Sequence, residues 1–247
     1  MLIYAHRGAS AQYPENTMLA FEKAVEMGAA GIETDVHLSR DGQLVLCHDE
    51  TIDGTTDRSG WIARLTYDEL LRADAGVRRG AQFAGQRIPL LRDLLKLARE
   101  SGIALNLELK NYVLDYPDLE RLVIEEIRKY LRPERVLLSS FRHLSLVRAK
   151  QMASETPTGL LYGCDLYRPA EYAAACGANA LHPDYTMLSA ETMREAKRAG
   201  LQVNVWTVDD PADMLRMRDM GVDVLMTNRP QTALRVLKEA DRQGEDA

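Results

Sequence analysis

The alternation of strand-like and helix-like segments after residue 88 limits the possible folds more than any other feature of this sequence. Short runs rich in Val, Leu and Ala alternate with amphipathic segments of roughly three turns. The expected strands are 103–109, 135–140, 158–162, 178–182, 201–207 and 222–226, and the expected helices are 90–101, 118–130, 143–153, 168–176, 190–199, 211–220 and 230–241. Strands separated by helices pair in parallel, so the pattern predicts an α/β fold with a parallel sheet.

The N-terminal part of the chain completes this pattern. The expected elements there are a strand from Leu2 to His6, a helix that ends near Gly28, a strand at 31–38, a hairpin turn at Asp41-Gly42 and a return strand at 43–48. Both ends together provide eight strand–helix pairs, the number that closes a TIM (β/α)8 barrel. An open doubly wound sheet is the alternative, but no GxGxxG motif follows the first strand.

Residues 49–88 interrupt the alternation. This stretch is rich in Gly, Thr, Asp and Arg and contains only a brief helical pattern, at 66–71. Loops of this length in a compact domain are usually functional. We therefore expect a single TIM-barrel domain over residues 1–247, with a small insertion after the second strand that covers the site.

Charge and cysteine content exclude several classes of protein. A net charge of -6 and a pI near 5.5 argue against nucleic-acid binding, because the chain has no basic surplus. The three cysteines are far apart, which indicates neither a disulfide framework nor a zinc site. No leader pattern precedes the first strand, and no apolar run reaches membrane-spanning length. We expect a cytoplasmic protein without stable membrane association, and the sequence leaves its oligomeric state open.

Three acidic residues on two expected strands form the candidate metal site. Glu33 and Asp35 are two residues apart, so both side chains point to the same face of their strand. Glu108 and Lys110 share one face of the next barrel strand. Three carboxylates suit hard Mg²⁺ or Ca²⁺ better than the His and Cys donors that zinc prefers. The acids could instead be structural partners of Arg7 or Lys110.

Two histidines at expected strand ends are candidates for acid–base catalysis. His6 ends the first strand, and the hairpin brings His48 back toward the acidic pair. Together with a metal and fixed cations, two imidazoles provide the base and the acid that phosphodiester cleavage requires. Trp206 lies at another strand end, where it either fills the barrel or forms an apolar wall for a small alcohol group.

Several ordered motifs resemble one family. They are HRG at 6–8, PENT at 14–17, ExDV at 33–36, HD at 48–49, IP at 88–89, NxExK at 106–110 and VWTV at 205–208. Together they resemble the glycerophosphodiester phosphodiesterases over nearly the whole chain. Two positions depart from the family pattern: Gly54-Thr55-Thr56 lacks a basic residue before the Thr pair, and Arg92 replaces an acidic residue.

The resemblance implies a role for each matching residue. His6 and His48 would be the acid–base pair, and Glu33, Asp35 and Glu108 would hold one divalent cation. The substrate-binding residues would be Arg7 and Lys110 at the phosphate, with Phe141 and Trp206 at the glycerol or alcohol side. The implied reaction is the metal-dependent hydrolysis of a small-molecule glycerophosphodiester to sn-glycerol 3-phosphate and an alcohol. The alternatives are a lysophospholipase D-type lipid phosphodiesterase and a noncatalytic phosphoester-binding protein.

Overall fold

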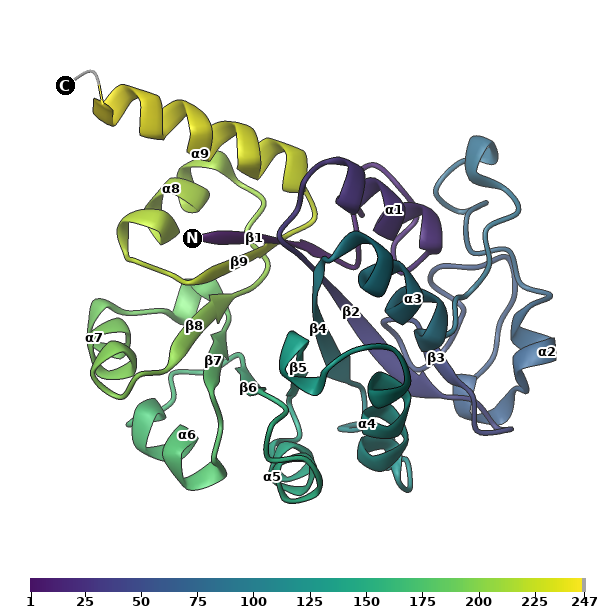
Figure 1. Cartoon of the computed structure of the whole chain (residues 1–247). Coiled ribbons are helices and arrows are strands. Elements are labelled where there is room, and N and C mark those ends of the chain that lie inside the picture. The colour runs from purple at the N-terminus through teal and green to yellow at the C-terminus, as the bar shows by residue number, and fades with distance from the viewer. Residues whose placement is uncertain (246–247) are drawn as a thin grey trace.

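Eight parallel strands close into a barrel (Figure 1). The computed structural model describes residues 1–245. The barrel strands are β1 (Leu2–His6), β2 (Gly31–Leu38), β4 (Ala104–Leu109), β5 (Val136–Ser140), β6 (Thr158–Tyr162), β7 (Ala180–Pro183), β8 (Gln202–Val205) and β9 (Val224–Thr227). The first strand pairs with both β2 and β9, which closes the ring. The predicted TIM barrel is therefore confirmed, and the open sheet is excluded.

Helices surround the barrel and cover its outer surface (Figure 1). They are α1 (Met18–Glu26), α3 (Leu91–Ser101), α4 (Leu119–Tyr130), α5 (His143–Met152), α6 (Pro169–Cys176), α7 (Ala190–Arg198), α8 (Pro211–Asp219) and α9 (Pro230–Glu245). Helix α3 shows why the helices pack against the barrel. Its buried residues lie at helical spacing on one face; they are Leu91, Leu94, Leu95 and Ala98. Within residues 1–245, no helix is long and apolar enough to cross a membrane.

The segment between β2 and α3 lies outside the ring, on one side of the barrel (Figure 1). It begins with β3 (Leu44–Leu46), which pairs antiparallel with β2, and the predicted hairpin is confirmed. The remaining elements of the segment are η1 (Ile62–Arg64), α2 (Tyr67–Leu70) and η2 (Ala81–Phe83). Two further 3-10 turns lie outside this segment: η3 (Pro133–Arg135) precedes β5, and η4 (Tyr185–Met187) follows β7. The segment has its own apolar cluster, which includes Ile52, Ile62 and Leu70. This separate cluster allows the segment to keep a defined shape beside the barrel.

The register of the strands places polar side chains at one level of the barrel. Asp35 is directly paired with Glu108 on β4, and Glu33 is paired with His6 on β1. Because side chains alternate along a strand, Glu33 and Asp35 point to the same side of β2. Pairing and alternation together bring these four side chains to one end of the barrel.

The interior of the barrel contains a second polar group, at β7 and β8. His182 is fully buried, and its Nε2 lies 2.9 Å from Nδ2 of Asn204. It fits only because the neighbouring residue on β6 is Gly159, where a Cβ would lie 2.3 Å from His182 Nε2. The side chain of His182 therefore packs inside the barrel.

We expect His182 to make the protein less stable in mild acid. Burial lowers its pKa from 6.5 to about 3, so between these values the unfolded chain binds a proton that the folded chain does not. The free energy of unfolding should therefore fall as the pH drops below the unfolded value, by about 1.4 kcal/mol per pH unit from this residue. Urea unfolding between about pH 7 and about pH 5 should give a shallower pH slope for His182→Gln than for wild type. Equal slopes would contradict this expectation.

Candidate active site

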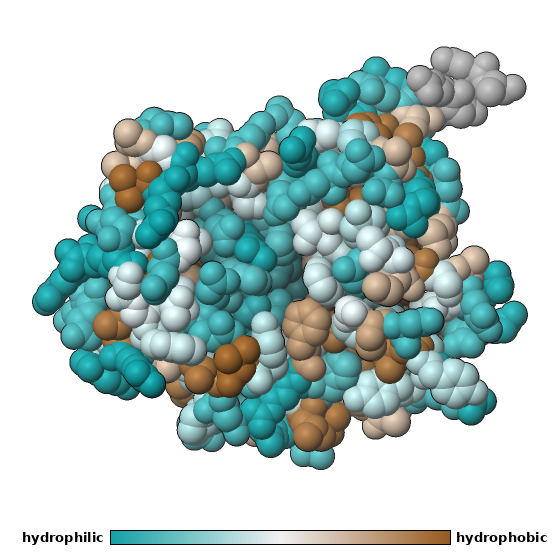
Figure 2. Space-filling model, turned by 180° about the vertical axis from the view of Figure 1, so that it is seen from behind, coloured by the Kyte–Doolittle hydropathy of each residue, from teal (hydrophilic) through white to brown (hydrophobic). Residues whose placement is uncertain are grey.

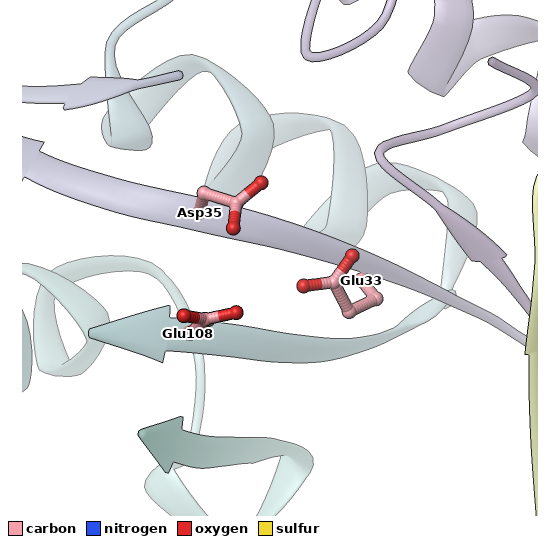
Figure 3. Close-up of side chains that lie close together, drawn as sticks. All are labelled: Glu33, Asp35 and Glu108. Atoms are coloured by element: carbon pink, nitrogen blue, oxygen red, sulfur yellow. The ribbon is translucent and has the colours of Figure 1, made fainter. Parts of the chain in front are cut away.

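Three carboxylates meet between β2 and β4 (Figure 3). Glu33 and Asp35 project from β2 toward Glu108 on β4, and one oxygen from each lies within 4.8 Å of the others. All three residues are buried. Among the described residues, this is the only cluster of three or more acidic, His or Cys side chains at such spacing. The structure thus brings together the three residues that the sequence singled out.

Two cations compensate part of this negative charge. The Nζ atom of Lys110 lies 3.0 Å from Glu108 Oε1 and 3.5 Å from Asp35 Oδ1, and Arg7 Nε lies 3.8 Å from Asp35 Oδ2. Asn16 donates a further hydrogen bond to Asp35 at 2.9 Å. Burial alone would raise the pKa of Asp35, but Lys110 and Arg7 hold this pKa far below its usual range. Asp35 is therefore ionised.

The other two carboxylates are less well compensated. Burial, together with the charges of Asp35 and Glu108, raises the pKa of Glu33 well above its usual value. Burial and Asp35 also raise the pKa of Glu108 to about 7, against the opposing effect of Lys110. Within the described residues, no Lys or Arg side-chain nitrogen lies within 4.0 Å of Glu33. The cluster therefore has too little positive charge for three ionised acids.

The turn after β1 holds Arg7 against this cluster. Arg7 and Gly8 both adopt positive φ values of 55° and 82°. A Cβ at Gly8 would lie 2.7 Å from the backbone of Ala20 on α1, so only glycine allows the helix to pack this closely on the turn. The guanidinium of Arg7 also pairs with Glu15 at 2.9 Å. The sequence motif HRG therefore corresponds to a tightly packed turn.

Hydrogen bonds fix the orientation of His6. Its Nδ1 lies 2.7 Å from Oδ1 of Asn228, which also accepts a bond from Ser10 Oγ. The amide of Asn228 donates to Asp209 at 2.6 Å, so its oxygen must accept the proton of His6 Nδ1. The other ring nitrogen, Nε2, is left with a free lone pair and lies 3.8 Å from Glu33 Oε2. Burial, and then the charge of Arg7, lowers the pKa of His6 to about 4. His6 is therefore a neutral imidazole with a basic nitrogen directed at the acidic cluster.

The second histidine lies near the first and has a different environment. His48 Nδ1 lies 2.7 Å from Asp49 Oδ1, a contact that orients the ring. The backbone oxygen of His48 accepts a bond from Nε2 of the buried His37 at 3.2 Å. Tyr116 OH in turn lies 2.9 Å from His37 Nδ1. His48 lies near both His6 and Asp35, so the hairpin does return it to the acidic pair.

Aromatic side chains form a row after β4, β5 and β8. The rings of Tyr112 and Phe141 are 5.6 Å apart, and Phe141 packs edge-on against Trp206 at the same distance. Trp206 also donates a hydrogen bond from Nε1 to the backbone oxygen of His182 at 2.8 Å. Figure 2 shows hydrophobic side chains beside a hydrophilic hollow on one face of the molecule. The two aromatic residues expected at the substrate therefore lie side by side.

Sequence reasoning missed several residues of the site. Asn16 is part of the PENT motif, but the motif did not reveal that its side chain contacts Asp35. Asp209 immediately follows the VWTV motif and orients Asn228, which orients His6. Tyr112 extends the aromatic row and lies near Lys110. These contacts join segments up to 222 residues apart, and no local pattern encodes them.

This arrangement offers the parts for acid–base chemistry on an anion. His6 has an unprotonated ring nitrogen, and His48 contacts the carboxylate of Asp49. Arg7 and Lys110 supply fixed positive charge at the same place. Both cations already contact carboxylates, so an incoming anion would share them with Asp35 and Glu108.

Comparison with known proteins identifies the family of this chain. The profile of the glycerophosphoryl diester phosphodiesterase family matches residues 6–232. A protein of Caldanaerobacter subterraneus subsp. tengcongensis named glycerophosphodiester phosphodiesterase is 42% identical, over 96% of this chain and 98% of its own. A Bacillus altitudinis protein of the same name is 36% identical, over 96% and 98%. The solved structure of an Oleispira antarctica phosphodiesterase in complex with the product sn-glycerol-3-phosphate is similar, with a TM-score of 0.92, 28% identity and coverage of 96% and 97%. The chain therefore belongs to the glycerophosphoryl diester phosphodiesterase family.

Proposed function

We propose that this protein hydrolyses glycerophosphodiesters to sn-glycerol 3-phosphate and an alcohol, with a divalent cation as cofactor. The observation that carries the proposal is the free Nε2 of His6, held by Asn228 beside the three carboxylates. Family membership supports it, and so does the similar Oleispira phosphodiesterase, which binds sn-glycerol-3-phosphate.

The carboxylates Glu33, Asp35 and Glu108 would hold one divalent cation. An all-oxygen donor set fits Mg²⁺ or Ca²⁺. The shortage of positive charge at Glu33 also fits a bound cation. When bound, the cation would neutralise charge that develops on the phosphoryl oxygens.

The remaining residues divide the acid–base and binding roles. His6 accepts a proton at Nε2 from the attacking hydroxyl, and Asn228 and Asp209 keep the ring in the required tautomer. His48 donates a proton to the departing alkoxide. Arg7 and Lys110 contact the phosphate oxygens, which adds fixed charge where negative charge increases. Phe141 and Trp206 provide an apolar wall for the glycerol or the alcohol.

A lysophospholipase D-type activity is the second candidate. Tyr112 and Val113 are about half exposed, next to the aromatic row. Apolar side chains in such a place could contact the acyl chain of a lysolipid. A noncatalytic phosphoester-binding role is less favoured, because mere binding does not require a base whose tautomer is set by two further side chains.

We expect the reaction products to identify the activity. The purified protein should release sn-glycerol 3-phosphate from glycerophosphocholine and from glycerophosphoethanolamine in the presence of Mg²⁺ or Ca²⁺, as measured with a coupled glycerol 3-phosphate assay. The same protein should release lysophosphatidic acid from lysophosphatidylcholine slowly or not at all. A His6→Ala preparation controls for contaminating enzymes. Faster turnover of the lysolipid would favour the second candidate, and binding of the diesters without any product would favour the noncatalytic role.

A further inference from the structure

A small cavity lies between the β1–α1 loop and the segment that follows the hairpin. It has a volume of about 170 Å³. Ser10, Tyr13 and Glu15 line it from the barrel side, and Thr55, Arg78 and Arg79 line it from the other side. The ring of Tyr13 packs edge-on against Phe83, with 5.9 Å between centroids. This contact and a hydrogen bond from Arg79 to the backbone oxygen of Ala11 hold the two walls together.

The two arginines give the cavity a net positive charge. Arg78 donates from Nε to the backbone oxygen of Thr56, and Arg79 donates from one terminal nitrogen to Ala11. Within residues 1–245, neither guanidinium forms an ion pair with a carboxylate, whereas the acidic residue of the cavity, Glu15, is paired with Arg7 at 2.9 Å. A guanidinium has five N–H donors, so both arginines retain free donors after these contacts. Backbone carbonyls position the arginines without neutralising them.

This cavity adjoins the proposed catalytic residues. Ser10, which lines it, places its Oγ 2.7 Å from the backbone oxygen of His6 and 2.8 Å from Oδ1 of Asn228. Glu15 connects the cavity to the acidic cluster through Arg7, which lies 3.8 Å from Asp35. The aromatic row follows other strands, β4, β5 and β8. The two arms of a bound phosphodiester would therefore meet an apolar wall and a cationic wall.

We propose that the cavity binds an anionic group, a carboxylate or a phosphate, on the alcohol arm of the diester. The proposal rests on the function proposed above and extends it to substrate choice. Arginine forks bind carboxylate and phosphate with paired charge-assisted hydrogen bonds. The cavity therefore selects glycerophosphodiesters whose alcohol carries an additional negative charge over those whose alcohol is only cationic or neutral.

A pair of substrates that differ by one carboxylate tests this proposal. Glycerophosphoserine carries a carboxylate that glycerophosphoethanolamine lacks. For wild type, kcat/KM should be higher for glycerophosphoserine, and Arg79→Gln or Arg78→Gln should lower this preference about 10-fold, mainly through KM. Arg79→Lys should restore part of it. The matched control is Arg72→Gln, because Arg72 is an exposed arginine of the same segment that does not line the cavity. The Arg72→Gln variant should show the same preference for glycerophosphoserine as wild type.

A second pair of substrates shows whether the cavity binds a phosphate group as well as a carboxylate. Glycerophosphoglycerol and its derivative with a terminal phosphate differ only by that phosphate, so their ratio shows whether the cavity accepts phosphate as well as carboxylate. If the ratio of kcat/KM within each substrate pair is the same in the arginine variants as in wild type, the proposal is overturned. If wild type cleaves none of these diesters, the proposed function fails. The cavity is then tested by calorimetric binding of glycerophosphoserine and glycerophosphoethanolamine, and equal affinities would overturn it independently.

Discussion

Replacing His6 or His48 with alanine should lower kcat by about 10²- to 10⁴-fold each, the range for the loss of a positioned proton-transfer group. The His6→Ala variant lacks the proposed base, whose tautomer is set by Asn228. The His48→Ala variant lacks the proposed acid, which contacts Asp49. Steady-state hydrolysis of glycerophosphocholine at saturating metal measures the effect. The combined loss in the double variant should be much smaller than the product of the single losses, because the two groups serve one reaction.

Two variants make this result specific. His143→Ala is the matched histidine control, because His143 contacts Leu161 and Tyr172 rather than the acidic cluster, and its kcat should equal that of wild type. Asn228→Ala should lower kcat with little change in KM, since it acts through the orientation of His6. Near wild-type turnover of His6→Ala over the whole pH range would remove His6 from the mechanism.

Removing divalent cations should abolish turnover, and activity should return when Mg²⁺ or Ca²⁺ is added. The variants Glu33→Gln, Asp35→Asn and Glu108→Gln should each weaken cation binding, because each removes one anionic ligand. Binding can be measured without turnover, since a cation that binds only the folded protein raises Tm. The cation-dependent rise in Tm should therefore be reduced in all three variants. Full activity after dialysis against excess EDTA would contradict a metal-dependent reaction.

The same variants should differ in the absence of the cation. Glu33 has no lysine or arginine partner within 4.0 Å among the described residues, so Glu33→Gln removes a poorly compensated buried acid and should be at least as stable as wild type. Asp35→Asn leaves Lys110 and Arg7 with less compensation and should be destabilised, because breaking a buried ion pair leaves an uncompensated charge. Urea unfolding in EDTA measures both effects. A destabilised Glu33→Gln variant would show that the acid has a structural role.

The barrel could be predicted because its signal is local and repeated. Each strand is a short apolar run, each helix has apolar residues at helical spacing, and the helix that begins at Leu91 follows this pattern in the structure. The capping box of Thr66 and Glu69 likewise forms where a helical pattern was expected in residues 66–71. Eight repeats of one unit leave few ways to close a sheet. For the barrel strands and helices the differences lie at the ends of elements, as in the strand expected at 201–207 that spans Gln202–Val205, whereas the four short 3-10 turns η1 to η4 were not expected.

The acidic cluster was also predictable, for a geometric reason. Alternation along β2 places Glu33 and Asp35 on one side whatever the rest of the chain does. Their pairing with β4 required only that the next barrel strand lie beside β2, and the register then places Asp35 opposite Glu108. Which cation compensates each acid was not predictable, because that depends on distances between side chains from three separate segments.

The sequence by itself determined the fold class, the family and the residue types of the site, since these depend on periodicity, spacing and motifs. Only the tertiary structure decided the state of each group. It made His6 a neutral base through Asn228 and Asp209, buried His182 inside the barrel beside Gly159, and placed Arg78 and Arg79 across a cavity from Ser10. The physical reason is that pKa values, tautomers and cavity charge depend on desolvation and on partners that are distant in the sequence, and only folding brings these partners together.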